Sequence, residues 1–107
     1  MERLRRLVLG RIPTTPEFAI GTSIWLAYEA KSVDDPVIAE LVQRGHAGGV
    51  REAATLLSEC GVADAPAVAL RLMATAEGLA IRVLVGGLEP RGAIGLLENL
   101  IAEVLPG

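Results

Sequence analysis

The stretch from residue 74 to residue 87, Ala-Thr-Ala-Glu-Gly-Leu-Ala-Ile-Arg-Val-Leu-Val-Gly-Gly, constrains the fold more than any other part of the chain. At about 100° per residue, the helix that contains it carries two apolar surfaces and only a narrow polar strip. The first surface holds Leu72, Ala76, Leu79, Ala80 and Val83, the second holds Leu70, Met73, Ala74, Ile81, Leu84 and Val85, and the strip holds Arg71, Thr75, Gly78 and Arg82. A surface helix of a monomer buries one stripe, so the pattern predicts one surface on the chain's own core and the other on a second copy. A helix that is simply central in a monomer is the alternative.

The small size of the side chains favours closely packed helices. Hydrophobic residues make up 51% of the 107 residues, but Phe, Trp and Tyr occur once each. Core volume must therefore come from Leu, Val, Ile and Ala, which suits helices better than a sheet in a single domain. Gly78 costs a helix interior about 0.5–1 kcal/mol relative to Ala, and a close helix crossing at this position would explain its presence.

Charge and cysteine content narrow the function classes. Ten basic and thirteen acidic residues give a net charge of −3, which provides no electrostatic footprint for nucleic acid. The single cysteine, Cys60, forms no disulfide within the chain, and the basic start lacks the apolar run of a signal peptide. Arg71, Glu77 and Arg82 interrupt the most apolar stretch, so no membrane span is expected. We therefore expect a cytoplasmic protein without a membrane partner.

Helix-start signals divide the chain into five helices. Thr15 precedes Pro16 and Asp35 precedes Pro36, and in each pair the first residue suits the N-cap while the proline suits the first helical position. The predicted helices span residues 2–11, 16–32, 35–60, 66–86 and 90–105. No strand pattern occurs. The predicted fold class is therefore all-α, with residues 1–107 as one domain and the last two helices as an antiparallel hairpin.

Two of these helices carry unusual patterns. The helix of residues 16–32 is apolar all round, which is typical of a central helix. The helix of residues 35–60 contains Gly45, Gly48 and Gly49 in its middle, where this much glycine weakens a helix by about a few kcal/mol in sum. The pattern allows a bend or a break at that point.

Two segments are similar to a known family. Residues 77–82, Glu-Gly-Leu-Ala-Ile-Arg, followed by a turn at 83–88 and an apolar last helix, resemble the C-terminal domain of TetR-family transcriptional regulators. Residues 25–30, Trp-Leu-Ala-Tyr-Glu-Ala, followed by Asp35-Pro36, resemble the Trp-containing helix and the Asp-Pro helix start of the same domain. The resemblance extends from about Leu4 to Leu105.

The resemblance implies a specific organisation. In that family the C-terminal domain binds a small molecule and dimerises through its last two helices, which form a four-helix bundle. Residues 1–12 would be the end of the linker helix, and residues 66–105 the dimerisation hairpin. The candidate dimer-interface residues are Leu79, Ile81, Leu84, Ile94, Leu97 and Ile101. DNA would be bound only through an N-terminal helix-turn-helix domain, which this sequence lacks, either as a fragment or as a natural form.

A mostly apolar cavity is expected between the helices of residues 16–32, 35–60 and 66–86. The candidate lining residues are Phe18, Thr22, Trp25, His46, Met73 and Glu77. The aromatic side chains would face the glycine-rich segment, which fills little volume, and Thr22 and His46 would orient an apolar guest. Plain core packing of Phe18, Trp25 and His46 is the alternative. Glu77 has no cation on its own helix face and needs a partner, either an arginine of a second subunit, His46 or a ligand.

Catalytic and metal chemistry find no support in the sequence. No serine or cysteine lies near a general base, and one His and one Cys, fourteen residues apart, make a poor set of metal ligands. We expect no enzyme activity, no metal and no cofactor. The leading hypothesis is a small-molecule-sensing and dimerisation domain of a TetR-like regulator, with a second copy and a small hydrophobic effector as partners. The alternative is a structural or protein-interaction helical dimer without a ligand.

Overall fold

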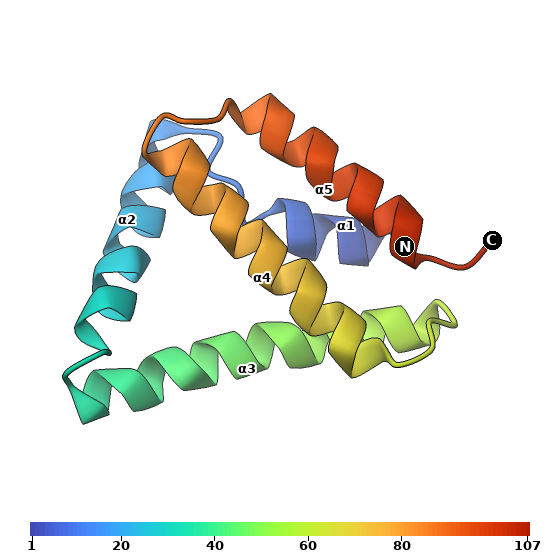
Figure 1. Ribbon diagram of the computed structural model, residues 1–107, viewed down its shortest axis with the longest axis horizontal. Helices are drawn as coiled ribbons and strands as arrows, with labels where there is room; N and C mark the ends of the chain where they lie inside the picture. Colours follow the sequence, from blue (N-terminus) through green and yellow to red (C-terminus); the bar gives the residue numbers. More distant parts are fainter.

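Helices occupy most of the chain, and the computed structural model describes all 107 residues. Five helices and no strand are present, which confirms the predicted all-α fold (Figure 1). Their bounds are α1 Glu2–Leu9, α2 Pro16–Lys31, α3 Pro36–Glu59, α4 Ala65–Leu84 and α5 Pro90–Val104.

The predicted caps start the second and third helices. The hydroxyl oxygen of Thr15 accepts a hydrogen bond from the backbone N–H of Phe18 at 3.1 Å. The carboxylate of Asp35 accepts hydrogen bonds from the N–H groups of Val37 and Ile38 at 3.1 and 3.3 Å. Each cap satisfies backbone donors that the first turn of a helix leaves free. Pro16 and Pro36 follow directly, so the local sequence explains where α2 and α3 begin.

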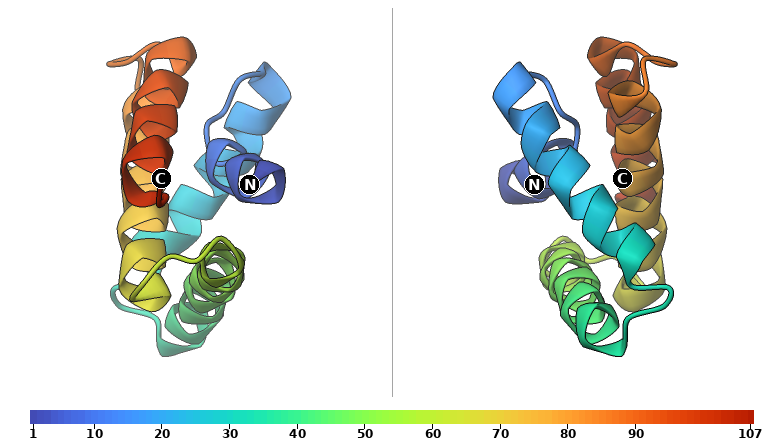
Figure 2. Two further views of the ribbon diagram at one scale, coloured as in Figure 1. Left: turned by 90° about the vertical axis from the view of Figure 1, so that its right-hand side faces the viewer. Right: turned by 90° about the vertical axis from the view of Figure 1, so that its left-hand side faces the viewer.

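Helix α4 is the centre of the fold, because each of the other four helices packs against it. Figure 1 shows α4 crossing α3 and α5 returning beside it in the opposite direction. In Figure 2 the α4–α5 pair forms one layer, α1 and α2 form the other, and α3 crosses the end of both. The buried core runs through Leu57 of α3, Leu72 of α4 and Leu97 of α5. Leu4 and Val8 of α1 complete it.

The two apolar surfaces of α4 have different environments. Leu72, Ala76 and Ala80 of the first surface are buried in the core of the chain. On the second surface, Leu70 is 59% exposed and Val85 is 74% exposed. Met73 departs from the predicted grouping, since it is buried in the core with the first surface. Most of the second surface is therefore free of contacts within the chain.

Helix α3 continues through its glycines without a break. A side chain at Gly45 would place its Cβ 2.7 Å from the Trp25 ring, and a Cβ at Gly49 would lie 2.8 Å from the Arg11 guanidinium. These glycines therefore admit Trp25 and Arg11 close to the helix backbone. The space that the sequence suggested for a ligand is filled here by side chains of the same chain.

Helix α2 is peripheral, so the prediction of a central helix was wrong. None of its residues is buried. One face packs against α3 and α4, and the other carries Ile20 and Ile24 at 63% and 54% exposure. A helix that is apolar all round needs cover on every side, and a single copy of this chain covers only one side of α2.

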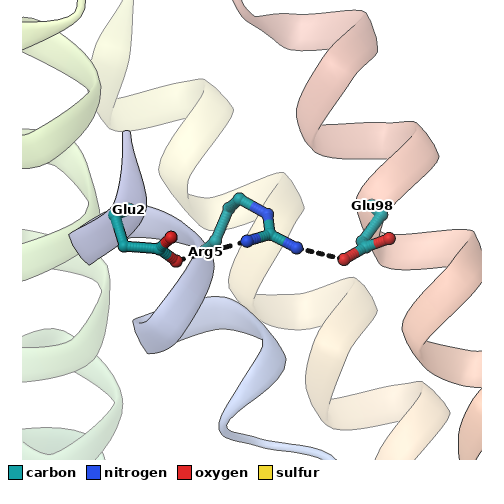
Figure 3. Close-up of polar contacts among 3 residues, drawn as sticks. All are labelled: Glu2, Arg5 and Glu98. Carbon is teal, nitrogen blue, oxygen red and sulfur yellow. Dashed lines mark hydrogen bonds and ion pairs between the residues drawn. The ribbon is translucent and has the colours of Figure 1, made fainter.

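The first helix is tied to the last by a charged bridge. Arg5 of α1 donates a hydrogen bond to Glu2 of the same helix at 3.2 Å and another to Glu98 of α5 (Figure 3). The bond to Glu98 and the charge of that carboxylate raise the pKa of the Arg5 guanidinium above its ordinary value, with a smaller effect of Glu2. The bridge connects α1 to α5 at the surface, while the buried Leu4 and Val8 hold α1 in the core.

None of the five helices combines the length and the apolar character required to cross a membrane.

Candidate ligand-binding cavity

A cavity of about 220 Å³ lies between α2 and α4 and reaches the residues that follow α1. Phe18, Trp25 and Ile81 provide most of its apolar wall. The polar part of the wall consists of Thr22, Glu29, Glu77 and Arg11. An apolar wall with a few polar groups is the usual make-up of a small-molecule site.

Helix periodicity brings the α2 side chains to one wall. Phe18, Thr22, Trp25 and Glu29 follow each other at intervals of four, three and four residues, so they lie on one face of the helix. This face is turned toward α3 and α4, opposite the exposed isoleucines. Hence the same face supplies the aromatic rings, a hydroxyl group and a carboxylate to the cavity.

Contacts with α3 hold Trp25 and Glu29 in place. The Trp25 ring lies against the backbone at Gly45 and meets the His46 ring edge to face, with ring centres 6.1 Å apart and planes at 76°. Nε2 of His46 donates a hydrogen bond to the carboxylate of Glu29 at 2.6 Å. His46 thus positions two of the residues that line the cavity from behind.

The remaining polar groups of the wall are available to a guest. The Thr22 hydroxyl donates to the backbone oxygen of Phe18 at 3.1 Å, so only its lone pairs are free to accept a hydrogen bond. Arg11 and Glu77 take part in none of the ion pairs of the chain. A half-buried charge without a partner is costly unless water or a ligand compensates it.

The structure brings together four of the six predicted pocket residues, namely Phe18, Thr22, Trp25 and Glu77. His46 is not on the wall but lies behind Trp25 and Glu29. Met73 is only 2% exposed and belongs to the core. The wall is thus formed by α2 and α4, as expected, and by Gly10 and Arg11 after α1 in place of the expected α3 residues.

Sequence reasoning missed some of the polar wall. Helix periodicity places Glu29 one turn after Trp25 on the same face, but Glu29 was not among the candidate lining residues. Periodicity could not indicate Arg11, because it lies beyond the end of α1 and reaches the cavity only through the tertiary fold. No local pattern distinguishes it from the other arginines near the start of the chain.

The predicted interface residues fall into different environments. Leu97 and Ile101 are 0% and 2% exposed within the single chain, so they belong to its own core and have no surface to offer a partner. Ile81 lines the cavity. Leu79 and Ile94 are half-buried and pack against the core. Leu84 borders a shallow hollow beside the turn between α4 and α5. The assignment of Leu97 and Ile101 to a dimer interface was therefore wrong.

No group of three or more His, Cys, Asp or Glu side chains is placed to hold a metal ion.

A strand-free domain with a largely apolar cavity, and with two charged side chains on its wall that form no ion pair, has the make-up of a helical binding domain. A family model described as the C-terminal domain of BetI-type transcriptional repressors matches residues 1–106. The chain therefore belongs to the TetR family of transcriptional regulators, as a C-terminal domain of the BetI-type repressors. This is a family of regulators and not of enzymes. No curated protein and no solved structure shows a significant similarity to the chain.

Proposed function

We propose that this domain binds a small, mainly apolar molecule in the cavity between α2 and α4 and forms a two-fold dimer through residues 66–105. In an intact regulator, a ligand that favours one of two dimer arrangements shifts the relative placement of two DNA-binding heads. Residues 1–12 then act as the end of the helix that links each head to its sensor. Such a regulator operates in the cytoplasm.

The composition of the cavity wall carries the ligand proposal. Phe18, Trp25 and Ile81 offer contact area to an apolar guest, while Arg11 and Glu77 are charged and have no ion-pair partner in the chain. The volume of about 220 Å³ lies below the roughly 300–1,000 Å³ of sites for drug-sized ligands. A guest about the size of a substituted benzene ring, with one polar group, suits this space.

Two glycines support the dimer proposal. A Cβ at Gly78 of α4 or at Gly95 of α5 would meet no atom within 4 Å, so nothing inside the chain requires glycine at either position. Alanine would favour each helix by about 0.5–1 kcal/mol. Close approach of a second copy would explain why glycine, and not a larger residue, occupies both positions. Leu70 and Leu96, which are exposed on the same two helices, would be covered by that copy.

Benzene-sized probes test the ligand proposal. Toluene, phenol, benzylamine and benzoate share one ring and differ in their polar group, and Trp25 is the only tryptophan that can report their entry. A probe at ten times its Kd stabilises the folded chain by about 1.4 kcal/mol, which raises the Tm by about 5 °C. We expect at least one probe to raise the Tm and to change the Trp25 emission at the same concentration.

Two variants connect binding to the cavity. Glu77→Gln removes a charge from the wall and should change the order of preference among the four probes. Glu103→Gln removes an exposed carboxylate of α5 outside the cavity and should leave that order unchanged. If no probe binds the unmodified chain up to its solubility limit, the alternative of a purely structural or protein-interaction dimer takes the place of the ligand proposal.

A further inference from the structure

Exposed large hydrophobic side chains are concentrated on α2 and the start of α3. Seven of the twelve exposed large hydrophobic residues of the chain lie between residues 18 and 41, although this segment is less than a quarter of the sequence. Six of these seven lie outside the cavity and off the α4–α5 pair, namely Ile20, Ile24, Tyr28, Val33, Val37 and Leu41. Neither the ligand proposal nor the α4–α5 dimer covers them.

The outer face of α2 forms one continuous stripe. At about 100° per residue, Glu17, Ile20, Ile24, Tyr28 and Lys31 fall within an arc of about 100°. All five are exposed. The arc is centred about 130° around the helix from the face that Phe18, Thr22, Trp25 and Glu29 turn to the cavity. We call these five residues the outer stripe.

The outer stripe is self-complementary. Glu17 lies seven residues before Ile24, and Lys31 lies seven residues after it. If a second α2 packs antiparallel across a two-fold axis at Ile24, then Glu17 of each copy meets Lys31 of the other. The same symmetry places Ile20 against Tyr28 and Ile24 against its own equivalent. A two-fold interface between identical faces has to be self-complementary, and opposite charges at equal distances from its centre meet this requirement.

The present partner of Lys31 does not oppose this pairing. Lys31 lies 3.5 Å from Asp34, with side chains 62% and 74% exposed. An ion pair this exposed contributes little and exchanges readily. Glu17 takes part in no ion pair of the chain. Both charged ends of the outer stripe are therefore free to meet a second copy.

From this geometry we infer that the outer stripe of α2 is a second self-association surface, on which another copy of the chain packs antiparallel about Ile24. The inference goes beyond the ligand and dimer proposals and does not depend on them. A helix of this length is about 24 Å long, so the contact is smaller than the roughly 800 Å² per partner of a standard interface. The association is accordingly reversible, with a Kd in the micromolar range or weaker. Combined with the proposed α4–α5 dimer, contact through the outer stripe joins two dimers into a tetramer.

Charge reversal tests the inference by sedimentation velocity at protein concentrations from about 1 to about 500 μM. The unmodified chain should show a reversible doubling of mass as its concentration rises. Glu17→Lys places lysine against lysine across the axis, and Lys31→Glu places glutamate against glutamate. Each single variant should weaken the doubling step about tenfold. The double variant E17K/K31E should restore it.

A mixture of the two single variants tests most specifically whether residue 17 of one copy meets residue 31 of the other. Equal amounts of E17K and K31E chains pair lysine with glutamate at both ends of the stripe, so the mixture should associate about tenfold more tightly than either variant alone. Arg44→Glu is the matched control, since it reverses an exposed charge on α3 outside the stripe and should associate like the unmodified chain. Circular dichroism verifies that every variant is helical.

Three results would overturn the inference. These are the absence of a concentration-dependent doubling in the unmodified chain, single variants that associate as it does, or a mixture that behaves as the sum of its parts. The first result would mean that a partner other than a second copy covers the stripe, and it would overturn the inference. Loss of the α4–α5 dimer alone lowers the starting mass but leaves the pattern among the charge variants unchanged, so the two proposals fail separately.

Discussion

Trp25 illustrates how single residues decide the shape of the cavity. Its ring occupies the notch at Gly45, where any side chain would place a carbon 2.7 Å from the ring. His46 contacts the ring edge to face and also holds Glu29. Glycine and histidine on α3 thus fix the position of two wall residues on α2 without touching the cavity themselves. The anchoring of α2 depends on these few contacts, because no residue of this helix is buried.

The substitution Gly45→Ala tests whether Trp25 needs the space at Gly45, because alanine otherwise favours a helix over glycine. The new methyl group displaces Trp25, so we expect the free energy of unfolding to fall by about 1–2 kcal/mol and the Trp25 emission to move to longer wavelength. Gly48→Ala is the control in the same helix, because a Cβ there meets nothing within 4 Å. It should raise the free energy of unfolding by about 0.5–1 kcal/mol. Urea unfolding measures the free energy of unfolding of both variants. Equal effects would show that Trp25 does not depend on the absence of a side chain at Gly45.

At the scale of elements, the sequence predicted the number of helices and most of their ends, because Thr15-Pro16 and Asp35-Pro36 are local signals. It could not predict the place of α2. An apolar pattern on all sides shows that a helix needs cover, but it does not say whether the cover is the same chain or another molecule. The α3 glycines were ambiguous for the same reason, since only the tertiary fold shows which side chains approach them.

At Gly78 of α4, too, the sequence could not tell whether a helix of the same chain or of another molecule packs against the glycine. The sequence indicated two apolar surfaces and a close crossing, and the structure leaves the glycine facing open space. Gly78→Leu should favour the isolated helix by about 0.8–1 kcal/mol while weakening a dimer through α4 and α5 at least about tenfold. Sedimentation equilibrium measures the association and thermal unfolding measures the stability. Gly48→Leu on α3 is the control, and an unchanged dimer of the Gly78 variant would count against the α4–α5 interface.

The whole molecule consists of two layers, the α4–α5 pair and the α1–α2 pair, with the cavity between α2 and α4 and exposed apolar side chains on both α2 and the α4–α5 pair. Four of the six pocket residues could be predicted from helix periodicity on α2 and α4. Arg11 could not, because only the packing of α1 against α3, α4 and α5 brings it to the wall. Leu97 was misplaced because an apolar stripe on α5 fits an interface as well as it fits a core.

A cavity-filling substitution tests the central claim, namely that the space between α2 and α4 is a binding site. Gly21 lines the cavity, and a Cβ there meets no atom within 4 Å. The Cβ of a leucine at this position meets no clash, and we expect the rest of its side chain to occupy the cavity. The substitution also improves the propensity of α2 by about 0.8–1 kcal/mol. The measurement is a phenol titration followed by Trp25 emission, on the unmodified chain, on Gly21→Leu and on Gly48→Leu as control.

The account predicts that phenol changes the Trp25 emission of the unmodified chain and of Gly48→Leu with the same Kd. Gly21→Leu should be at least as stable as the unmodified chain and should bind phenol at least about tenfold more weakly, because the leucine side chain occupies the space of the guest. Equal phenol affinity in all three chains, or no response in the unmodified chain, would contradict the account.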